Sequence, residues 1–263
     1  MSYISLMTDF GTRDGNVGVM KGVIWNIAPE AKIADLSHEI DPQHIRQAAF
    51  VLGRHAFYFP ENTIHVVVVD PGVGTERRPI AAQIGPQRFV GPDNGVCTLM
   101  LERAERNYWP VKLVHLNKPE YWLTKVSDIF HGRDIFSPAA AHLAGGASLD
   151  DLGVAIDDPV RIPIPQPRRT PQGWLGEVVY IDRFGNIASN IHRDDLAGLG
   201  EVTVTLAGIT IKGLVRTFGE RRPGELIALY SSNDYLIVSV VNGNAAAEIK
   251  ASVGDAIEVA SHS

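Results

Sequence analysis

The stretch "IHVVVVDPGVGTERR" (residues 64–78) guides the interpretation of the whole chain. Its apolar run, interrupted only by His65, predicts a buried β-strand. The strand ends in Asp70, and a turn with two glycines leads on to Arg77 and Arg78. In open α/β sheets, loops at the carboxyl ends of strands carry the ligand sites. A carboxylate paired with an arginine there predicts a binding or catalytic loop, although a surface turn with a weak ion pair would have the same residues.

Predicted strands and helices alternate through the first half of the chain. Strands are expected at 3–9, 32–40, 63–70, 78–84, 88–95 and 111–117, and helices at 16–29, 41–60 (with Pro42 at the start), 95–104 and 134–146. The alternation predicts an α/β domain with a central, mostly parallel sheet. Since Asp9 and Asp70 both end predicted strands, we expect them at the same edge of that sheet.

The composition changes in residues 157–174, which hold five prolines. Beyond them, short apolar stretches separated by Gly and polar turns predict a smaller all-β domain, barrel-like in form. The predicted organisation is therefore an N-terminal α/β domain (1–160), a proline-rich linker (161–172) and a C-terminal β domain (173–263).

Composition and charge exclude several function classes. The chain has 263 residues and a net charge of −6 with no basic block, so no nucleic-acid partner is expected. One cysteine, Cys97, rules out an internal disulfide and a cysteine-based zinc site. No apolar run is long enough to cross a membrane and no leader-like segment opens the chain, so we expect a soluble, cytoplasmic protein.

Two further stretches of the first half carry candidate site residues. In "TDFGTRDGNVGVMKGVI" (8–24), Asp9 precedes a glycine-rich turn, where a carboxylate can accept hydrogen bonds from a ribose diol or simply form a turn. In "SDIFHGRDIFSPAAAHLA" (127–144), His131 follows Phe130 in a turn and can hold a water or assist a developing charge. The turn "GPDNG" (91–95) is equally compatible with a structural role.

The second half has polar side chains among apolar strands. In "YIDRFGNIASNI" these include Asp182, Asn186 and Ser189, and in "YSSNDYLIVSVVNGNAA" they include Asn242. Such groups suit an adenine edge or an amino-acid zwitterion, but asparagine is also common in turns. Phe218 would be an aromatic lid or a core residue.

Taken in order, the stretches 8–24, 66–78, 91–95, 130–144, 182–191 and 235–246 resemble the S-adenosyl-L-methionine hydroxide adenosyltransferases, which are related to fluorinases and chlorinases. The resemblance implies an N-terminal α/β domain, a C-terminal barrel-like domain and a homotrimer. It also implies active sites at subunit interfaces, between the first domain of one subunit and the second domain of its neighbour.

The resemblance implies catalytic roles for Asp70, Arg77 and His131, although the adjacent Arg78 leaves open which arginine faces the site. The implied substrate-binding residues are Asp9, Phe130, Asp182, Asn186, Ser189, Phe218, Asn242 and Ala245. A one-residue shift is possible near Asn242. No metal and no cofactor is implied besides S-adenosyl-L-methionine as substrate.

The implied reaction is attack of water or hydroxide on C5′ of S-adenosyl-L-methionine, giving adenosine and L-methionine. The fluorinase has a tyrosine where this chain has Asp70, and a carboxylate there would repel a halide.

Two alternatives remain at the level of sequence. One is a metal-dependent phosphohydrolase that uses Asp9, Asp14, Asp93 and His131 with Asp70. The other is a non-catalytic protein that binds adenosine or S-adenosyl-L-methionine.

Overall fold

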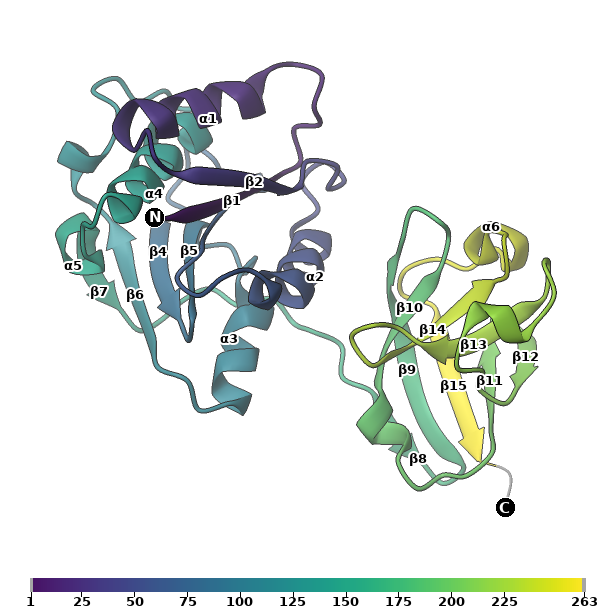
Figure 1. The fold of residues 1–263 in the computed structure, drawn as a ribbon. Coiled ribbons are helices and arrows are strands. Elements are labelled where there is room, and N and C mark those ends of the chain that lie inside the picture. Colours follow the sequence, from purple (N-terminus) through teal and green to yellow (C-terminus); the bar gives the residue numbers. More distant parts are fainter. Residues whose placement is uncertain (1, 262–263) are drawn as a thin grey trace. The chain divides into compact units, whose positions relative to one another are not determined.

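The computed structural model describes residues 2–261. The chain divides into two compact units, one reaching to Ile162 and the other starting at Pro163, and each is described by itself (Figure 1).

The first unit is built on a seven-stranded mixed sheet of order β2-β1-β3-β5-β4-β6-β7. Pairing is parallel from β2 through β1 and β3 to β5, and β4, β6 and β7 are antiparallel additions. The strands are β1 (Tyr3–Thr8), β2 (Lys32–Ser37), β3 (Ile64–Val68), β4 (Pro79–Ile84), β5 (Gln87–Pro92), β6 (Val111–Leu116) and β7 (Gly153–Ile156). The predicted α/β class is confirmed, with parallel pairing concentrated in the half of the sheet that carries Asp9 and Asp70.

Helices cover both faces of this sheet (Figure 1). They are α1 (Asn16–Ile27), α2 (Ile45–His55), α3 (Thr98–Arg106), α4 (Ser137–Ala144) and α5 (Leu149–Leu152). Successive residues of a strand point to opposite faces. Val66 and Val68 of β3 therefore pack with α1 and α4, whereas Val67 and the adjoining Val69 pack with α2 and α3. Burial on both faces explains why this strand is an almost unbroken apolar run.

Two helices of the structure begin later than the sequence predicted. The helix expected to begin at Pro42 begins at Ile45, because Gln43 has a left-handed φ of 65° and His44 caps the helix by accepting from the Gln47 backbone N–H. The helix expected over 134–146 begins only at Ser137 and ends at Ala144, because Gly132–Phe136 form a π-helical turn. The strand β7 and the short helix α5 were not expected from the sequence.

The second unit is an antiparallel, barrel-like sheet of order β12-β11-β15-β9-β10-β14-β13, with β8 added beside β9. Its elements are β8 (Arg168–Thr170), β9 (Gly173–Ile181), β10 (Ile187–His192), β11 (Val202–Leu206), β12 (Ile209–Lys212), β13 (Leu226–Tyr230), β14 (Tyr235–Val240), α6 (Ala245–Ile249) and β15 (Ala256–Ser261). The β class predicted for this half is confirmed. The strand β8 lies within the predicted proline-rich linker (161–172), so residues 168–170 of that linker belong to this sheet.

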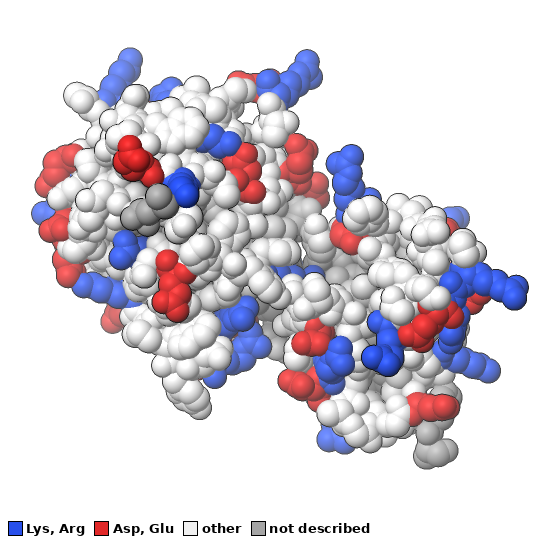
Figure 2. All heavy atoms as spheres, in the orientation of Figure 1, with Lys and Arg blue, Asp and Glu red and all other residues white. Residues whose placement is uncertain are grey.

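The surface charges and the single cysteine are placed as follows. On the face shown in Figure 2, described acidic and basic side chains are interspersed over both units. None of the described helices is long and apolar enough to cross a membrane. Cys97 is buried at the start of α3, and burial raises the pKa of its thiol to about 12.

Candidate active site

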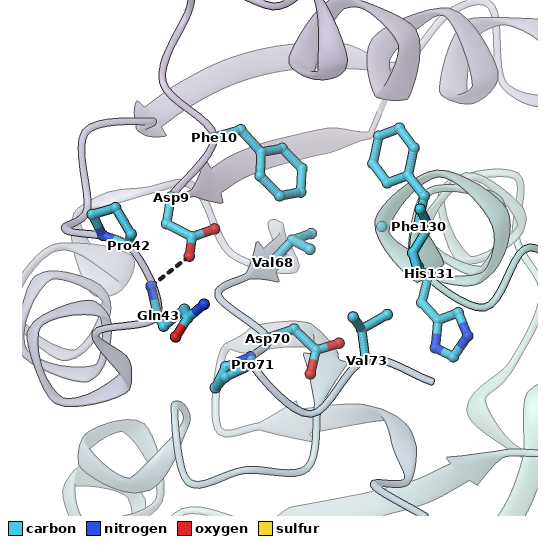
Figure 3. A pocket seen from close by; sticks show the side chains of 12 residues that line it. Asp9, Phe10, Pro42, Gln43, Val68, Asp70, Pro71, Val73, Phe130 and His131 are labelled. Atoms are coloured by element: carbon cyan, nitrogen blue, oxygen red, sulfur yellow. Dashed lines mark hydrogen bonds between the residues drawn. The ribbon is translucent and has the colours of Figure 1, made fainter. Parts of the chain in front are cut away.

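The site lies where β1 and β3 end. These strands are parallel, with Thr8 opposite Val68, so the chain leaves both of them at the same edge of the sheet. Asp9 follows β1, and Asp70 follows β3 after one further buried residue. Figure 3 shows both carboxylates bordering the same pocket. The expectation that the two aspartates share one edge of the sheet is confirmed.

Asp70 and Arg77 form a two-point ion pair across the loop. The Arg77 Nε donates to Asp70 Oδ1 at 3.0 Å, and Nη2 donates to Oδ2 at 2.5 Å. Only 3% of the Asp70 side chain and 7% of the Arg77 side chain is exposed. A buried, bidentate pair of this kind has a fixed geometry, unlike a solvated surface pair.

The second glycine of this loop allows close contact with the segment that carries His131. Gly74 has a φ of 75°, and a Cβ at this position would lie 2.4 Å from the carbonyl oxygen of Asp128. Only a residue without a side chain fits such an approach. Gly74 therefore brings the loop of Asp70 and Arg77 against residues 128–131.

His131 joins the pair through Arg77. The distance between Arg77 Nη2 and His131 Nδ1 is 3.1 Å. A guanidinium only donates hydrogen bonds, so Nδ1 must accept, and the proton of the neutral ring lies on Nε2. Burial and then the nearby Arg77 cation lower the pKa of His131. The ring is consequently neutral at neutral pH and offers an N–H donor from Nε2.

Burial also changes the Asp70 carboxyl. It raises the pKa of Asp70, and the Arg77 guanidinium opposes this effect by charge and by hydrogen bonding. A carboxylate with a raised pKa is a stronger proton acceptor than an ordinary surface aspartate. Asp70 thus combines fixed geometry with increased basicity.

Arg77, and not Arg78, contacts Asp70 and His131. The Arg78 guanidinium contacts Asp93 and Asp158 instead, at 2.6 Å and 2.8 Å. The sequence left the choice between these neighbours open, and the structure resolves it because their side chains leave the chain in different directions.

A pocket of about 340 Å³ extends from this cluster to Asp9. The Oδ2 atom of Asp9 accepts a hydrogen bond of 2.8 Å from the Gln43 backbone N–H, which fixes the carboxylate (Figure 3). Phe10 and Phe130 meet edge to face, with ring centroids 5.7 Å apart, along one side of the pocket. The remaining lining residues are Pro42, Val68, Pro71, Val73, Ile129 and Gly132.

Sequence reasoning missed Phe10 and Gln43 as lining residues. Phe10 carried a signal, since it follows Asp9 directly at a strand end. Gln43 carried none, because it lies in the pocket only through its left-handed backbone, and glutamine gives no sequence indication of that conformation.

The second unit brings several of its candidates together. Asp182 accepts from the backbone N–H of Asn186 at 2.9 Å and from its side-chain Nδ2 at 2.8 Å. The Ala246 N–H donates to the Gly185 carbonyl, so this turn lies beside the start of α6, where Ala245 is buried. Asn242 has a left-handed φ of 55° in the preceding turn.

Two other candidate residues of the second unit, Ser189 and Phe218, lie outside this group. The Ser189 side chain is fully buried in β10, and its hydroxyl donates to the Leu236 carbonyl at 2.8 Å. Phe218 is 39% exposed in the connection between β12 and β13, so it is not a core residue in this unit. Within residues 2–261, no three His, Cys, Asp or Glu side chains gather as a metal site would require.

Comparison with known proteins agrees with this arrangement. Residues 4–153 match the model of the SAM hydroxide adenosyltransferase N-terminal domain, and residues 176–258 match that of the C-terminal domain. The chain is 37% identical to an (R)-S-adenosyl-L-methionine hydrolase of Salinispora tropica, over 98% of this chain and 97% of that protein. It is 28% identical to a fluorinase of an Actinoplanes species, over 90% of each chain.

The fold also occurs in a solved structure. An uncharacterised conserved protein of Thermotoga maritima superposes with a TM-score of 0.89 at 34% identity, over 98% of this chain and 99% of that one. Fold and site thus define a class of two-unit proteins that join an α/β sheet, with a polar site at its strand ends, to an antiparallel barrel. Within that class, the chain belongs to the SAM hydroxide adenosyltransferase family.

Proposed function

We propose that this protein hydrolyses S-adenosyl-L-methionine at C5′, giving adenosine and L-methionine. The observation that carries the proposal is the buried cluster of Asp70, Arg77 and His131 at the edge of the pocket that also holds Asp9. Relatives named (R)-S-adenosyl-L-methionine hydrolase, at 33% to 37% identity, support the same reaction.

In the proposed mechanism, a water oxygen attacks C5′ while the bond from C5′ to the sulfonium sulfur breaks. Methionine leaves as a neutral thioether, so the leaving group needs no acid. The difficult step is activation of water. Asp70 accepts a hydrogen bond from the water and then its proton, and its raised pKa favours that transfer.

Arg77 and His131 orient the carboxylate and the water. Arg77 occupies one lone pair on each Asp70 oxygen, which leaves another for the water. The Nε2–H of His131 donates to the water oxygen and directs a lone pair toward C5′. Alignment of this kind can supply about 7–11 kcal/mol of the barrier reduction at best.

Asp9 binds the ribose in this proposal. Its Oδ2 already accepts from Gln43, and its other oxygen remains available to the ribose hydroxyls. Phe130 forms an apolar wall beside the reacting carbon. We assign Asp182, Asn186 and Ser189 to the methionine part, and Phe218, Asn242 and Ala245 to the adenine.

We further propose a homotrimer in which the first unit of one subunit and the second unit of its neighbour share each active site. No cofactor or metal takes part. We place the reaction in the cytoplasm, where a lone free thiol such as Cys97 is typical.

The direct test is incubation of the purified protein with S-adenosyl-L-methionine, with and without EDTA and chloride, followed by chromatography. Adenosine and methionine should form in EDTA, and Asp70→Ala should abolish them. Loss of activity in EDTA would favour the phosphohydrolase or another metal-dependent reaction. Binding without turnover would favour a non-catalytic role, and a 5′-chloro product would show that Asp70 tolerates a halide.

Subunit mixing tests the shared site. His131→Ala and Asp182→Ala each disable one half of the proposed site, in different units. If neighbouring subunits share sites, trimers reassembled from equal amounts of both variants regain roughly a quarter of the wild-type sites by random assortment. If each site lies within one chain, every mixed trimer stays inactive.

A further inference from the structure

The turn of residues 91–95 holds both ends of the loop that carries Asp70 and Arg77. At one end, the Asn94 Nδ2 donates to the carbonyl of Val69, the residue before Asp70, at 2.9 Å. The Val96 N–H donates to Asn94 Oδ1 at 3.2 Å, which fixes the amide orientation.

At the other end, Asp93 holds Arg78, the residue after Arg77. The Asp93 Oδ2 atom accepts from Arg78 Nε at 2.9 Å and from Nη2 at 2.6 Å. The backbone N–H of Asp93 also donates to the Arg78 carbonyl at 2.9 Å. The Asp93 side chain is 1% exposed, so its carboxylate is shielded from water, whereas the Arg78 side chain is 28% exposed.

Arg78 and Asp93 also bind the segment that leads out of the first unit. Arg78 Nη1 donates to Asp158 Oδ1, and Nη2 donates to the Asp158 carbonyl, both at 2.8 Å. The Val160 N–H donates to the second Asp93 oxygen at 2.8 Å. Every oxygen of the Asp93 carboxylate and every nitrogen of the Arg78 guanidinium is therefore engaged.

We propose that Arg78, Asp93 and Asn94 are positioning residues for the reaction, because they fix the two ends of the catalytic loop and thereby hold Arg77 between Asp70 and His131. This inference rests on the proposed hydrolysis of S-adenosyl-L-methionine for its kinetic test. None of the three residues has to touch the substrate.

The need for such anchors follows from the composition of the loop. Residues 70–78 contain two glycines, which give the backbone a wide choice of conformations. The bidentate contact of Arg77 tolerates only small displacements of either partner. Misplacement of a reacting group by about 1 Å can cost about 100-fold in rate. Fixing Val69 and Arg78 reduces this freedom at both ends of the loop.

Kinetics of three variants test the proposal. Asp93→Asn removes the charge that holds Arg78, Asn94→Ala releases Val69, and Arg78→Ala releases both Asp93 and Asp158. Each should lower kcat by about 10- to 100-fold while KM changes by less than about 3-fold, since orientation and not substrate contact is lost. Arg78→Lys keeps a cation within reach of Asp93 and should restore part of kcat.

A second readout does not depend on the reaction. The charged groups that face His131 are Arg77, Asp70, Asp134 and Asp128. Release of the loop moves the Arg77 cation away from Nδ1, so the pKa of His131, followed by NMR titration of its ring, should rise in Arg78→Ala. A wild-type protein without hydrolase activity would refute the proposed function, and this titration would still decide the positioning role.

Arg161→Ala is the matched control. Arg161 lies on the same exit segment and pairs with Glu105 on α3, with no bond to residues 69–78 among its described contacts. The Arg161→Ala variant should have a kcat within about 2-fold of wild type. The pKa of His131 in this variant should equal the wild-type value within experimental error. Unchanged kcat and an unchanged His131 titration in folded Arg78→Ala and Asn94→Ala, with only a lower melting temperature, would overturn the inference.

Discussion

At the scale of single residues, the site depends on hydrogen bonds whose direction is fixed by chemistry. Arg77 can only donate, so it determines which nitrogen of His131 accepts and which carries the proton. The sequence indicated these residues as site candidates by their places in a strand-end loop and a turn, and the motif resemblance assigned them catalytic roles. It did not predict that Arg78 would turn to Asp93, because the deciding contact joins residues fifteen positions apart.

Asp70→Ala should destabilise the folded protein. The substitution removes both oxygens that accept hydrogen bonds from the buried Arg77 guanidinium, which costs about 3 kcal/mol or more of unfolding free energy. Urea unfolding monitored by circular dichroism measures the change. Asp150→Ala, which breaks the exposed pair with Lys112, is the control and should have a much smaller effect. Equal effects of the two substitutions would show that the buried pair is not held as described.

The pH dependence of kcat/KM should have an acidic limb. In the proposed mechanism the Asp70 carboxylate is the active form, and its pKa is raised, so activity should be lost as pH falls through that raised value. His131 has a lowered pKa and is neutral at and above neutral pH, so it adds no basic limb. A pH series with S-adenosyl-L-methionine tests this expectation, and a loss of activity toward mildly basic pH would contradict the assigned ionisation of His131.

At the scale of elements, β3 and its loop could be predicted because a buried strand is a recognisable apolar run. Helix starts were harder. Pro42 is typical of a first helical turn, but tertiary contacts override this preference, since the Gln43 N–H bonds to Asp9 and the helix begins at Ile45. The π-helical turn after His131 has no distinctive composition, so sequence periodicity alone could not reveal it.

The buried histidine of β3 should make stability depend on pH. Burial lowers the pKa of His65 from 6.5 to about 4. A lowered pKa means that folding favours the neutral ring, so its contribution is complete above the unfolded pKa and is lost as pH falls. The loss by pH 4 is about 3 kcal/mol. Unfolding of His65→Asn over this range should show a shallower slope than wild type, and an identical slope would contradict the assignment.

Two glycines of the loop of residues 70–78 should respond differently to substitution by alanine. Gly74→Ala places a Cβ against the Asp128 carbonyl and strains a positive φ, at a cost of about 2 kcal/mol or more, and should displace Arg77 and lower activity. Gly72→Ala meets nothing closer than 3.4 Å and should be nearly neutral. Melting temperatures and kcat of both variants test this, and a fully active Gly74→Ala protein would exclude the close approach.

At the scale of the whole molecule, the change in composition after residue 157 indicated that a second kind of architecture follows. Alternating strands and helices give way to short strands with Gly-rich turns, and the fold changes from a mixed sheet with helices on both faces to an antiparallel barrel. The exact division could not be predicted, because β8 uses part of the proline-rich stretch to pair with β9.

Residues 1–162 alone should fold and keep the cluster of Asp70, Arg77 and His131. The contacts described between Asp70, Arg77, His131, Asp93 and Asn94 all lie within the first unit. His131 should keep its lowered pKa in this fragment, and an NMR titration of its ring measures this. The fragment should not hydrolyse S-adenosyl-L-methionine, because the proposed methionine and adenine contacts are on the second unit. Turnover by the fragment would refute those assignments.

The inaccessible thiol of Cys97 makes this protein convenient for fluorescence spectroscopy. With a pKa of about 12 and a fully buried side chain, the thiol should not react with maleimide dyes in the native state. A cysteine introduced on the surface would then take up dye selectively, without first mutating the native residue. One donor on the first unit and one acceptor on the second would report their separation as substrate binds, molecule by molecule.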